Sequence, residues 1–171
     1  MKKFLLLTFV LVCSLTCFAS AKIKEGTLAC LSGEKTISVC LDLTDTKYKK
    51  KRPLDEFLLK KRRVKDWKKQ SLDYFVTTFN QRSVTYGFKV VADSQEDKYI
   101  LVIAPKNVKG DGSLEGEAYL IEKGSSEKKV VFEFSSDDGD DDDEITFRDP
   151  LKELGETFAK IFVKGIKKAQ N

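Results

Sequence analysis

The order of the apolar patterns along this chain constrains its fold more than any other feature. Between Thr36 and Leu43 apolar and polar side chains alternate, which is the period of a strand with one buried face. From Leu54 to about Gln81, and again from Asp149 onward, apolar side chains recur at helical spacing. Strands grouped around two long helices are typical of an α+β fold. We therefore predict an antiparallel sheet of about five or six strands with both helices packed on one face.

Turn residues separate the expected strands, which span residues 26–31, 36–43, 86–92, 99–104, 114–122 and 129–135. The expected order of elements is β-β-α-β-β-β-β-α, with a hairpin turn at Ser32-Gly33-Glu34 joining the first two strands. Asp149 and Pro150 suit the start of the last helix, as a cap followed by a first-turn proline. The first helix would be long, and the sequence leaves open whether residues 54–81 form one continuous helix.

The amino terminus has the layout of a secretory signal peptide. A basic start precedes an apolar run from Phe4 to Leu15, and Ala19-Ser20-Ala21 then places small residues where a signal peptidase reads them. We predict cleavage after Ala21, which leaves 150 of the 171 residues as one α+β domain, 22–171, with a net charge reduced from +4 to +2. No later apolar run approaches the roughly 20 residues of a membrane span. The expected location is the periplasm or the extracellular space.

Cys17 offers a second interpretation, because a cysteine at the cleavage point of a lipoprotein is acylated. The positions that should hold Leu and a small residue hold Ser14 and Thr16 instead, so we favour cleavage after Ala21. The other two cysteines, Cys30 and Cys40, lie in a chain whose compartment permits disulfides. In the expected hairpin they would be out of register, which favours two ordinary strand cysteines over a bridge.

Histidine is absent from the whole chain. Its absence removes the commonest general base, the commonest metal ligand and every nucleophile arrangement that relies on histidine. We expect no cofactor. An enzyme built on this sequence would have to work with carboxylates alone, with two carboxyl groups held in one cleft.

A strongly basic stretch runs from Lys47 to Lys69. Twelve cations face three acids there, for a net charge of +9. The candidate binding residues are Lys60, Lys61, Arg62, Arg63, Lys65, Lys68 and Lys69. Such a cluster can hold phosphate groups, an anionic membrane surface or an acidic protein face. The alternative is a solvated helix face whose aliphatic stems cover the rim of the sheet. Export argues against nucleic acid as the partner.

An acidic stretch forms the opposite pole, with seven acids in the eight residues 137–144. We interpret residues 136–146 as a self-repelling loop. Weak binding of a divalent cation at Asp140, Asp141, Asp142 and Asp143 is an alternative, although the spacing does not match an EF-hand. Contact with the chain's own basic stretch is a third interpretation. We expect no metal site with defined ligands.

Three segments carry a resemblance to known proteins: Leu31 to Val39, Gly87 to Val91, and Asp97 to Val102, with a long charged helix between the first two. The chain resembles small exported proteins of unknown function from Gram-negative gut bacteria. More distantly it is similar to envelope lipoproteins related to the curli-secretion lipoprotein and to the TolB amino-terminal domain. The resemblance implies a fold and an envelope setting, and it supplies no catalytic residues.

Two functional hypotheses follow from these features. The first is a non-enzymatic binding or accessory module that docks an acidic protein face or an anionic envelope component through residues 47–69. The second is a carboxylate-dependent hydrolase that acts on an envelope or extracellular glycan. The oligomeric state stays open at this point.

Overall fold

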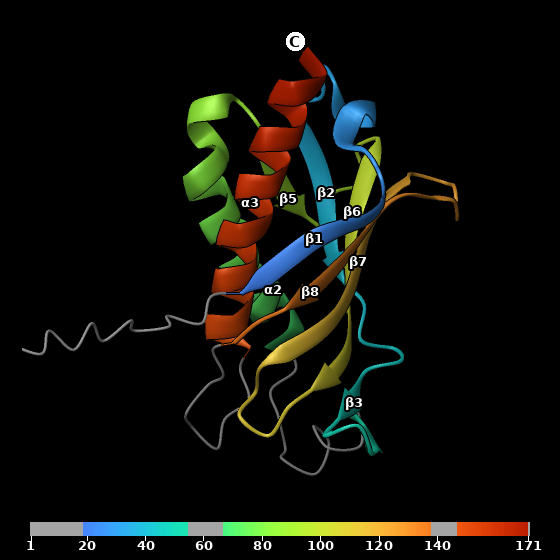
Figure 1. The fold of residues 1–171 in the computed structure, drawn as a ribbon, viewed down its shortest axis with the longest axis vertical. Coiled ribbons are helices and arrows are strands. Elements are labelled where there is room, and N and C mark those ends of the chain that lie inside the picture. Colours follow the sequence, from blue (N-terminus) through green and yellow to red (C-terminus); the bar gives the residue numbers. More distant parts are fainter. Residues whose placement is uncertain (1–18, 55–66, 138–146, 171) are drawn as a thin grey trace, which may run out of the picture.

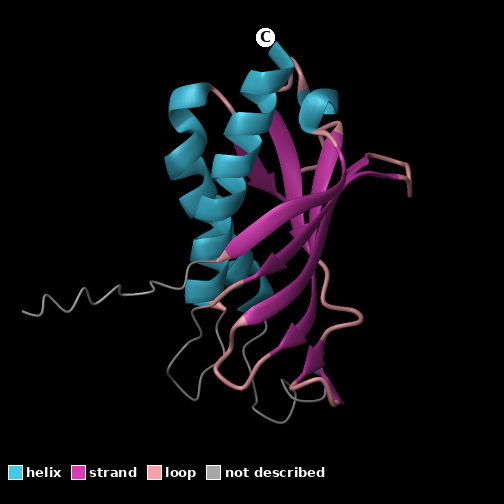
Figure 2. Ribbon diagram, viewed as in Figure 1, coloured by secondary structure: helices cyan, strands magenta, loops and turns pink. Residues whose placement is uncertain are grey.

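A computed structural model describes residues 19–54, 67–137 and 147–170 (Figure 1). Within these ranges the chain forms one eight-stranded sheet, and Figure 2 shows the two long helices together on one side of it. In chain order the elements are β1 (Ser20–Gly26), η1 (Leu28–Leu31), β2 (Thr36–Leu41), β3 (Lys47–Tyr48), β4 (Arg52–Pro53), α2 (Trp67–Ser83), η2 (Val84–Tyr86), β5 (Lys89–Ala92), β6 (Tyr99–Val108), β7 (Leu114–Glu122), β8 (Lys128–Ser135) and α3 (Arg148–Gln170). The predicted α+β class is confirmed.

The sheet is mixed, so the predicted antiparallel sheet of five or six strands is wrong in strand number and in direction. The main strand order is β1-β8-β7-β6-β2-β5, and the short strands β3 and β4 extend the sheet beside the end of β6. β1, β8, β7 and β6 are antiparallel neighbours, whereas β2 runs parallel to both β5 and β6. The chain passes from β2 to β5 through α2, and a long helical crossover allows it to return in the same direction.

The start of the fold differs from the prediction. Residues 26–31 were expected to form the first strand of a hairpin, but Leu28–Leu31 is a 3₁₀ helix, and β1 instead begins at Ser20 and pairs with β8. Thr27 explains the change, since its side-chain oxygen accepts a hydrogen bond from the Ala29 N–H and caps the short helix. β1 therefore contains Ser20 and Ala21, the last two residues of the predicted signal peptide.

Ala19, just before β1, belongs to the core. It is 7% exposed, its N–H donates to Glu153 Oε1 at 2.8 Å, and its carbonyl accepts from Thr157 Oγ1 at 3.2 Å. Both partners lie on α3, so these contacts join the start of the described chain to its last helix. Cleavage after Ala21 stays a prediction, and it would remove all of these contacts.

Of the helix predicted over residues 54–81, the structure describes the second part, which is α2 from Trp67 to Ser83. The question whether one continuous helix begins at residue 54 concerns residues 55–66, which lie outside the described residues. The last helix begins at Arg148, one residue before the predicted cap, with Asp149 in its first turn. There the carboxylate faces the positive end of the helix dipole. No helix in the described ranges is long and apolar enough to span a membrane.

A cluster of phenylalanines joins the two helices to the sheet. Phe75 and Phe79 of α2 meet Phe158 and Phe162 of α3, with ring centroids 5.6 to 5.9 Å apart for the pairs Phe75–Phe158 and Phe79–Phe162. All four rings are fully buried. Gly155 lets the helices approach closely, because a Cβ there would lie 2.7 Å from the Phe75 carbonyl oxygen.

Candidate functional site

The basic stretch is only partly described, and its described part is a hairpin. Lys60, Lys61, Arg62, Arg63 and Lys65 lie outside the described residues. Lys68 and Lys69 are exposed near the start of α2. The remaining cations of the stretch lie on and between β3 and β4, which we call the basic hairpin, residues 47–53. This hairpin was not among the predicted elements, because the segment lacks the Asn-Gly or Asp-Gly signal of a tight hairpin.

The turn of the basic hairpin has two lysines in an unfavourable backbone conformation. Lys49 and Lys50 have φ values of 52° and 59°, and the Lys51 N–H donates to the Tyr48 carbonyl at 3.1 Å. Two consecutive positive φ values inside such a bond are the pattern of a type I′ turn, which favours Asn and Gly. A side chain other than Gly costs about 1 kcal/mol or more at each such position. The surrounding structure must hold this turn in place.

Asn107 of β6 stabilises this turn through a hydrogen bond. Its side-chain oxygen accepts from the Lys50 N–H at 2.7 Å, while its amide group donates to Glu115 Oε1 at 3.0 Å. The Lys49 N–H donates to the Val108 carbonyl at 2.7 Å, so both strained residues are tied to the end of β6. Asn107 is 5% exposed, which shields these bonds from water.

The base of the hairpin is anchored in the same way. The Thr46 hydroxyl donates to the Pro105 carbonyl at 2.6 Å, and the Leu54 N–H donates to the Thr46 carbonyl at 2.9 Å. Thr46 and Leu54 are both buried. The backbone of the hairpin is therefore fixed to the body of the fold, and its cations are carried on a projection.

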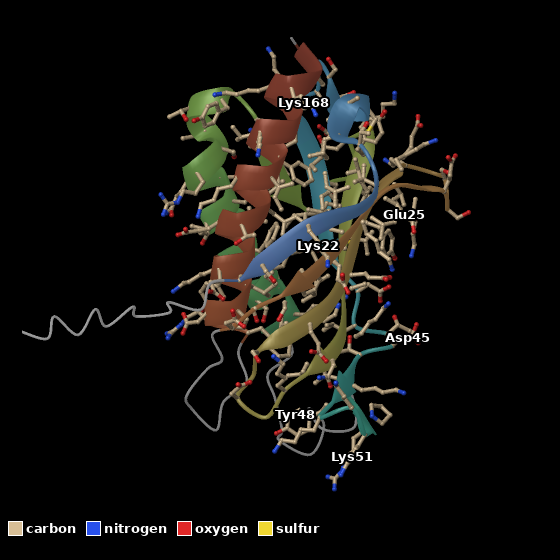
Figure 3. The ribbon with its side chains drawn as sticks, viewed as in Figure 1. Lys22, Glu25, Asp45, Tyr48, Lys51 and Lys168 are labelled. Atoms are coloured by element: carbon tan, nitrogen blue, oxygen red, sulfur yellow. The ribbon has the colours of Figure 1, made fainter. Side chains whose placement is uncertain are left out.

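Several of these charges face solvent without a counter-ion. Among the described residues no ion pair involves Lys47, Lys51 or Arg52, and Asp45 is the one carboxylate between Thr44 and Leu54. Lys50 lies 3.5 Å from Glu115, and Lys49 Nζ lies 5.3 Å from the Tyr48 ring centroid. Figure 3 shows Tyr48 and Lys51 at one end of the long axis of the molecule, with Lys168 near the other end.

An open hollow adjoins the hairpin. Its volume is about 540 Å³, and it is lined by Thr44, Asp45, Thr46, Lys47, Pro53 and Lys106. Lys106 adds a further cation beside the hairpin, although its ammonium lies 3.0 Å from Glu117. The described surface here offers positive charge on a projecting edge beside an open hollow.

A second hollow bears on the hydrolase hypothesis. It has a volume of about 450 Å³, lies on the sheet face away from the helices, and contains Glu115, Glu117 and Glu133. A hydrogen bond from Lys106 lowers the pKa of Glu117, and Lys24 at 3.3 Å acts in the same direction. A general acid needs a raised pKa, so Glu117 is suited to remain an anion. The lowered pKa of Glu117 does not support it as a general acid, and the hydrolase hypothesis stays a prediction.

The described part of the chain contains no group of three or more acids, cysteines or histidines that could hold a metal ion. The four aspartates proposed for weak divalent binding, Asp140 to Asp143, lie outside the described residues. Of the predicted acidic loop 136–146, Ser136 and Asp137 are described. Ser136 is fully buried and its hydroxyl oxygen accepts from the Leu114 N–H at 2.8 Å, so it belongs to the end of the sheet and not to a loop. Asp137 is exposed, and its N–H donates to Glu153 Oε2 at 3.3 Å.

Cys30 and Cys40 are both free thiols. The expectation that both lie in strands is wrong for Cys30, which sits in η1, because the predicted hairpin does not form. Cys40 lies in β2 and is half-buried. Burial raises the pKa of the Cys40 thiol, and the charge of Asp93 raises it further.

Cys40 should therefore react slowly with alkylating reagents. A raised pKa leaves a smaller thiolate fraction at a given pH, so alkylation at pH 8 is expected to be several-fold slower than in the urea-unfolded chain. Asp93→Asn should speed the reaction, since it removes a charge that opposes the thiolate. Peptide-level mass spectrometry after timed iodoacetamide treatment measures both rates. A Cys30–Cys40 disulfide, or equal rates in the folded and unfolded chain, would contradict this expectation.

Comparison with known proteins adds little to this description. The chain matches no protein-family model and no curated protein. Two solved structures of PelC from Paraburkholderia phytofirmans resemble it weakly. A PelC dodecamer in space group P6 aligns with a TM-score of 0.42 and 10% identity, and a variant of the same dodecamer in space group C2 aligns with 0.40 and 11%. Each alignment covers 80% of this chain and 97% of the PelC chain.

Proposed function

We propose that this chain is an exported, non-enzymatic binding module of the cell envelope that docks an anionic partner through its basic segment, residues 47–69. The signal-peptide layout supports the location, and the resemblance to small exported envelope proteins agrees with it. The observation that carries the docking proposal is the basic hairpin, where Lys47, Lys51 and Arg52 are exposed on a fixed projection without ion pairs among the described residues.

Electrostatic docking of this kind should weaken with salt. The Debye length falls from about 14 Å at 50 mM salt to about 4 Å at 500 mM, so exposed charges lose most of their reach. We expect the protein to sediment with the envelope fraction of its native host at the lower salt concentration and to be released at the higher one.

The hairpin itself is tested by charge removal. In the variant K51Q/R52Q the binding constant for the envelope fraction should fall about tenfold or more. Each basic residue near an anionic surface contributes roughly fivefold to that constant. The matched control is K164Q/K168Q, which removes two exposed cations from α3, away from the hairpin. Retention that is unchanged by salt, or equal loss in both variants, would contradict the proposal.

A further inference from the structure

The turn of the basic hairpin carries charge at a cost to stability. Lys49 and Lys50 occupy the two left-handed positions where Asn and Gly would be more stable. Their charges bring little in return, because Lys50 is 77% exposed in its pair with Glu115 and exposed pairs contribute almost nothing. Backbone strain that does not stabilise the fold points to a role at a contact surface.

The shape of this region indicates what kind of partner it can meet. The hairpin projects at one end of the long axis, as Figure 3 shows for Tyr48 and Lys51. The neighbouring hollow is open and includes the acidic side chain of Asp45. An open hollow beside exposed cations does not enclose a small ligand. A broad and flat anionic surface requires no matching cavity.

The residues between the lysines also suit such a surface. Tyr48 is half-buried with its ring near the Lys49 ammonium, and Pro53 is exposed beside Arg52. Tyrosine is favoured at the boundary between lipid headgroups and water, and long basic side chains reach from that boundary to phosphate groups. The hairpin thus combines exposed cations with a half-buried tyrosine that also packs against the core.

We propose that the basic hairpin docks onto the surface of an anionic phospholipid bilayer, with Lys49, Lys50, Lys51 and Arg52 as the contacting cations. This inference rests on the proposed function, since it names the anionic partner of the same site. Each cation near an anionic bilayer contributes roughly fivefold to partitioning, so four of them give several hundredfold. Docking of this strength is reversible and depends on salt.

The experiment is sedimentation of the purified protein with vesicles. Vesicles of phosphatidylglycerol and phosphatidylcholine should bind the protein at low salt, and vesicles of phosphatidylcholine alone should not. The variant K49N/K50G should bind the anionic vesicles about 25-fold more weakly, since it loses two cations that each contribute roughly fivefold. Its urea midpoint should stay equal or rise, because Asn and Gly relieve the strain, so weaker binding cannot be ascribed to unfolding. K164Q/K168Q should bind like the unchanged chain.

A second probe distinguishes the lipid assignment from the broader proposal of an anionic partner. Immobilised poly-glutamate presents the same charge on a peptide instead of a lipid. Binding to poly-glutamate that depends on the hairpin, without binding to anionic vesicles, would overturn the lipid assignment and leave the proposed function standing. Binding to neither probe would overturn both. Equal vesicle binding by K49N/K50G and the unchanged chain would overturn the role of the lysine turn.

Discussion

A chain that begins at Lys22 should be less stable by about 3 kcal/mol than one that begins at Phe18. It loses the hydrogen bond from the Ala19 N–H to the Glu153 carboxylate, and a bond to a charged group contributes about 1.5–3 kcal/mol. It also loses the bond from Thr157 and the pairing of Ser20 and Ala21 with β8. This loss is a large part of the 5–15 kcal/mol that is typical of a domain.

Urea unfolding followed by far-ultraviolet circular dichroism measures the difference. Phe18 is the right starting point for the reference chain, because Ala19 then keeps a peptide N–H. Glu153→Gln in the longer chain provides a control, since it removes the charge from the acceptor while the backbone of β1 remains. Equal midpoints for the two chain lengths would show that the contacts of Ala19 contribute nothing to stability.

Phe158→Ala is expected to cost about 4 kcal/mol, which is near the middle of the range for truncating a buried phenylalanine. The ring is fully buried, and it lies within 5.2 Å of Phe132 and 5.9 Å of Phe75 between centroids. Its removal leaves a cavity where α2, α3 and β8 meet. The free energy of unfolding in urea and the thermal midpoint both report the loss.

Two milder substitutions keep the test informative if Phe158→Ala does not fold. Phe158→Leu keeps most of the volume and should cost less than half as much as Phe158→Ala. Ile161→Ala is a matched substitution one turn away on α3, at a half-buried position outside the ring cluster, and should cost less than Phe158→Ala. Equal losses at positions 158 and 161 would mean that the ring cluster is not the centre of the core.

The elements with the clearest periodicity were predicted well. β7 spans Leu114–Glu122 as expected, and β8 and α3 each begin one residue before their predicted starts. These segments alternate or repeat over many residues and end at clear turns, so local pattern is enough to locate them. Their buried faces follow the same pattern, with Phe132 and Phe134 inward on β8 and Phe158 inward on α3.

Strand direction and the first strand could not be obtained in this way. Alternation in β2 says which face is buried, but it does not say whether a neighbour runs parallel or antiparallel. β1 escaped notice because Ser20 and Ala21 also fit the end of a signal peptide. In both cases the deciding contacts are made with residues far away in the sequence.

The sequence drew attention to the basic segment without showing how its backbone folds. The density of positive charge pointed to residues 47–69, but the hairpin and its turn were missed because Lys49-Lys50 carries no turn signal. Asn107, which holds the turn, lies 57 residues from Lys50 and would be found only from the pairing of β3 with β6. The run of lysines was the one available sign that this connection differs from an ordinary loop.

The placement of β1 has a consequence for the order in which the molecule assembles. β1 precedes every other described strand in the chain, yet its neighbour in the sheet is β8, the last described strand, which Lys22 to Gly26 still reach after cleavage at the predicted site. Contacts between such distant residues close a long loop and slow folding. The β1 edge of the sheet cannot form until β8 has been made. Late closure of this edge is compatible with the proposed export, in which a chain crosses a membrane before it folds.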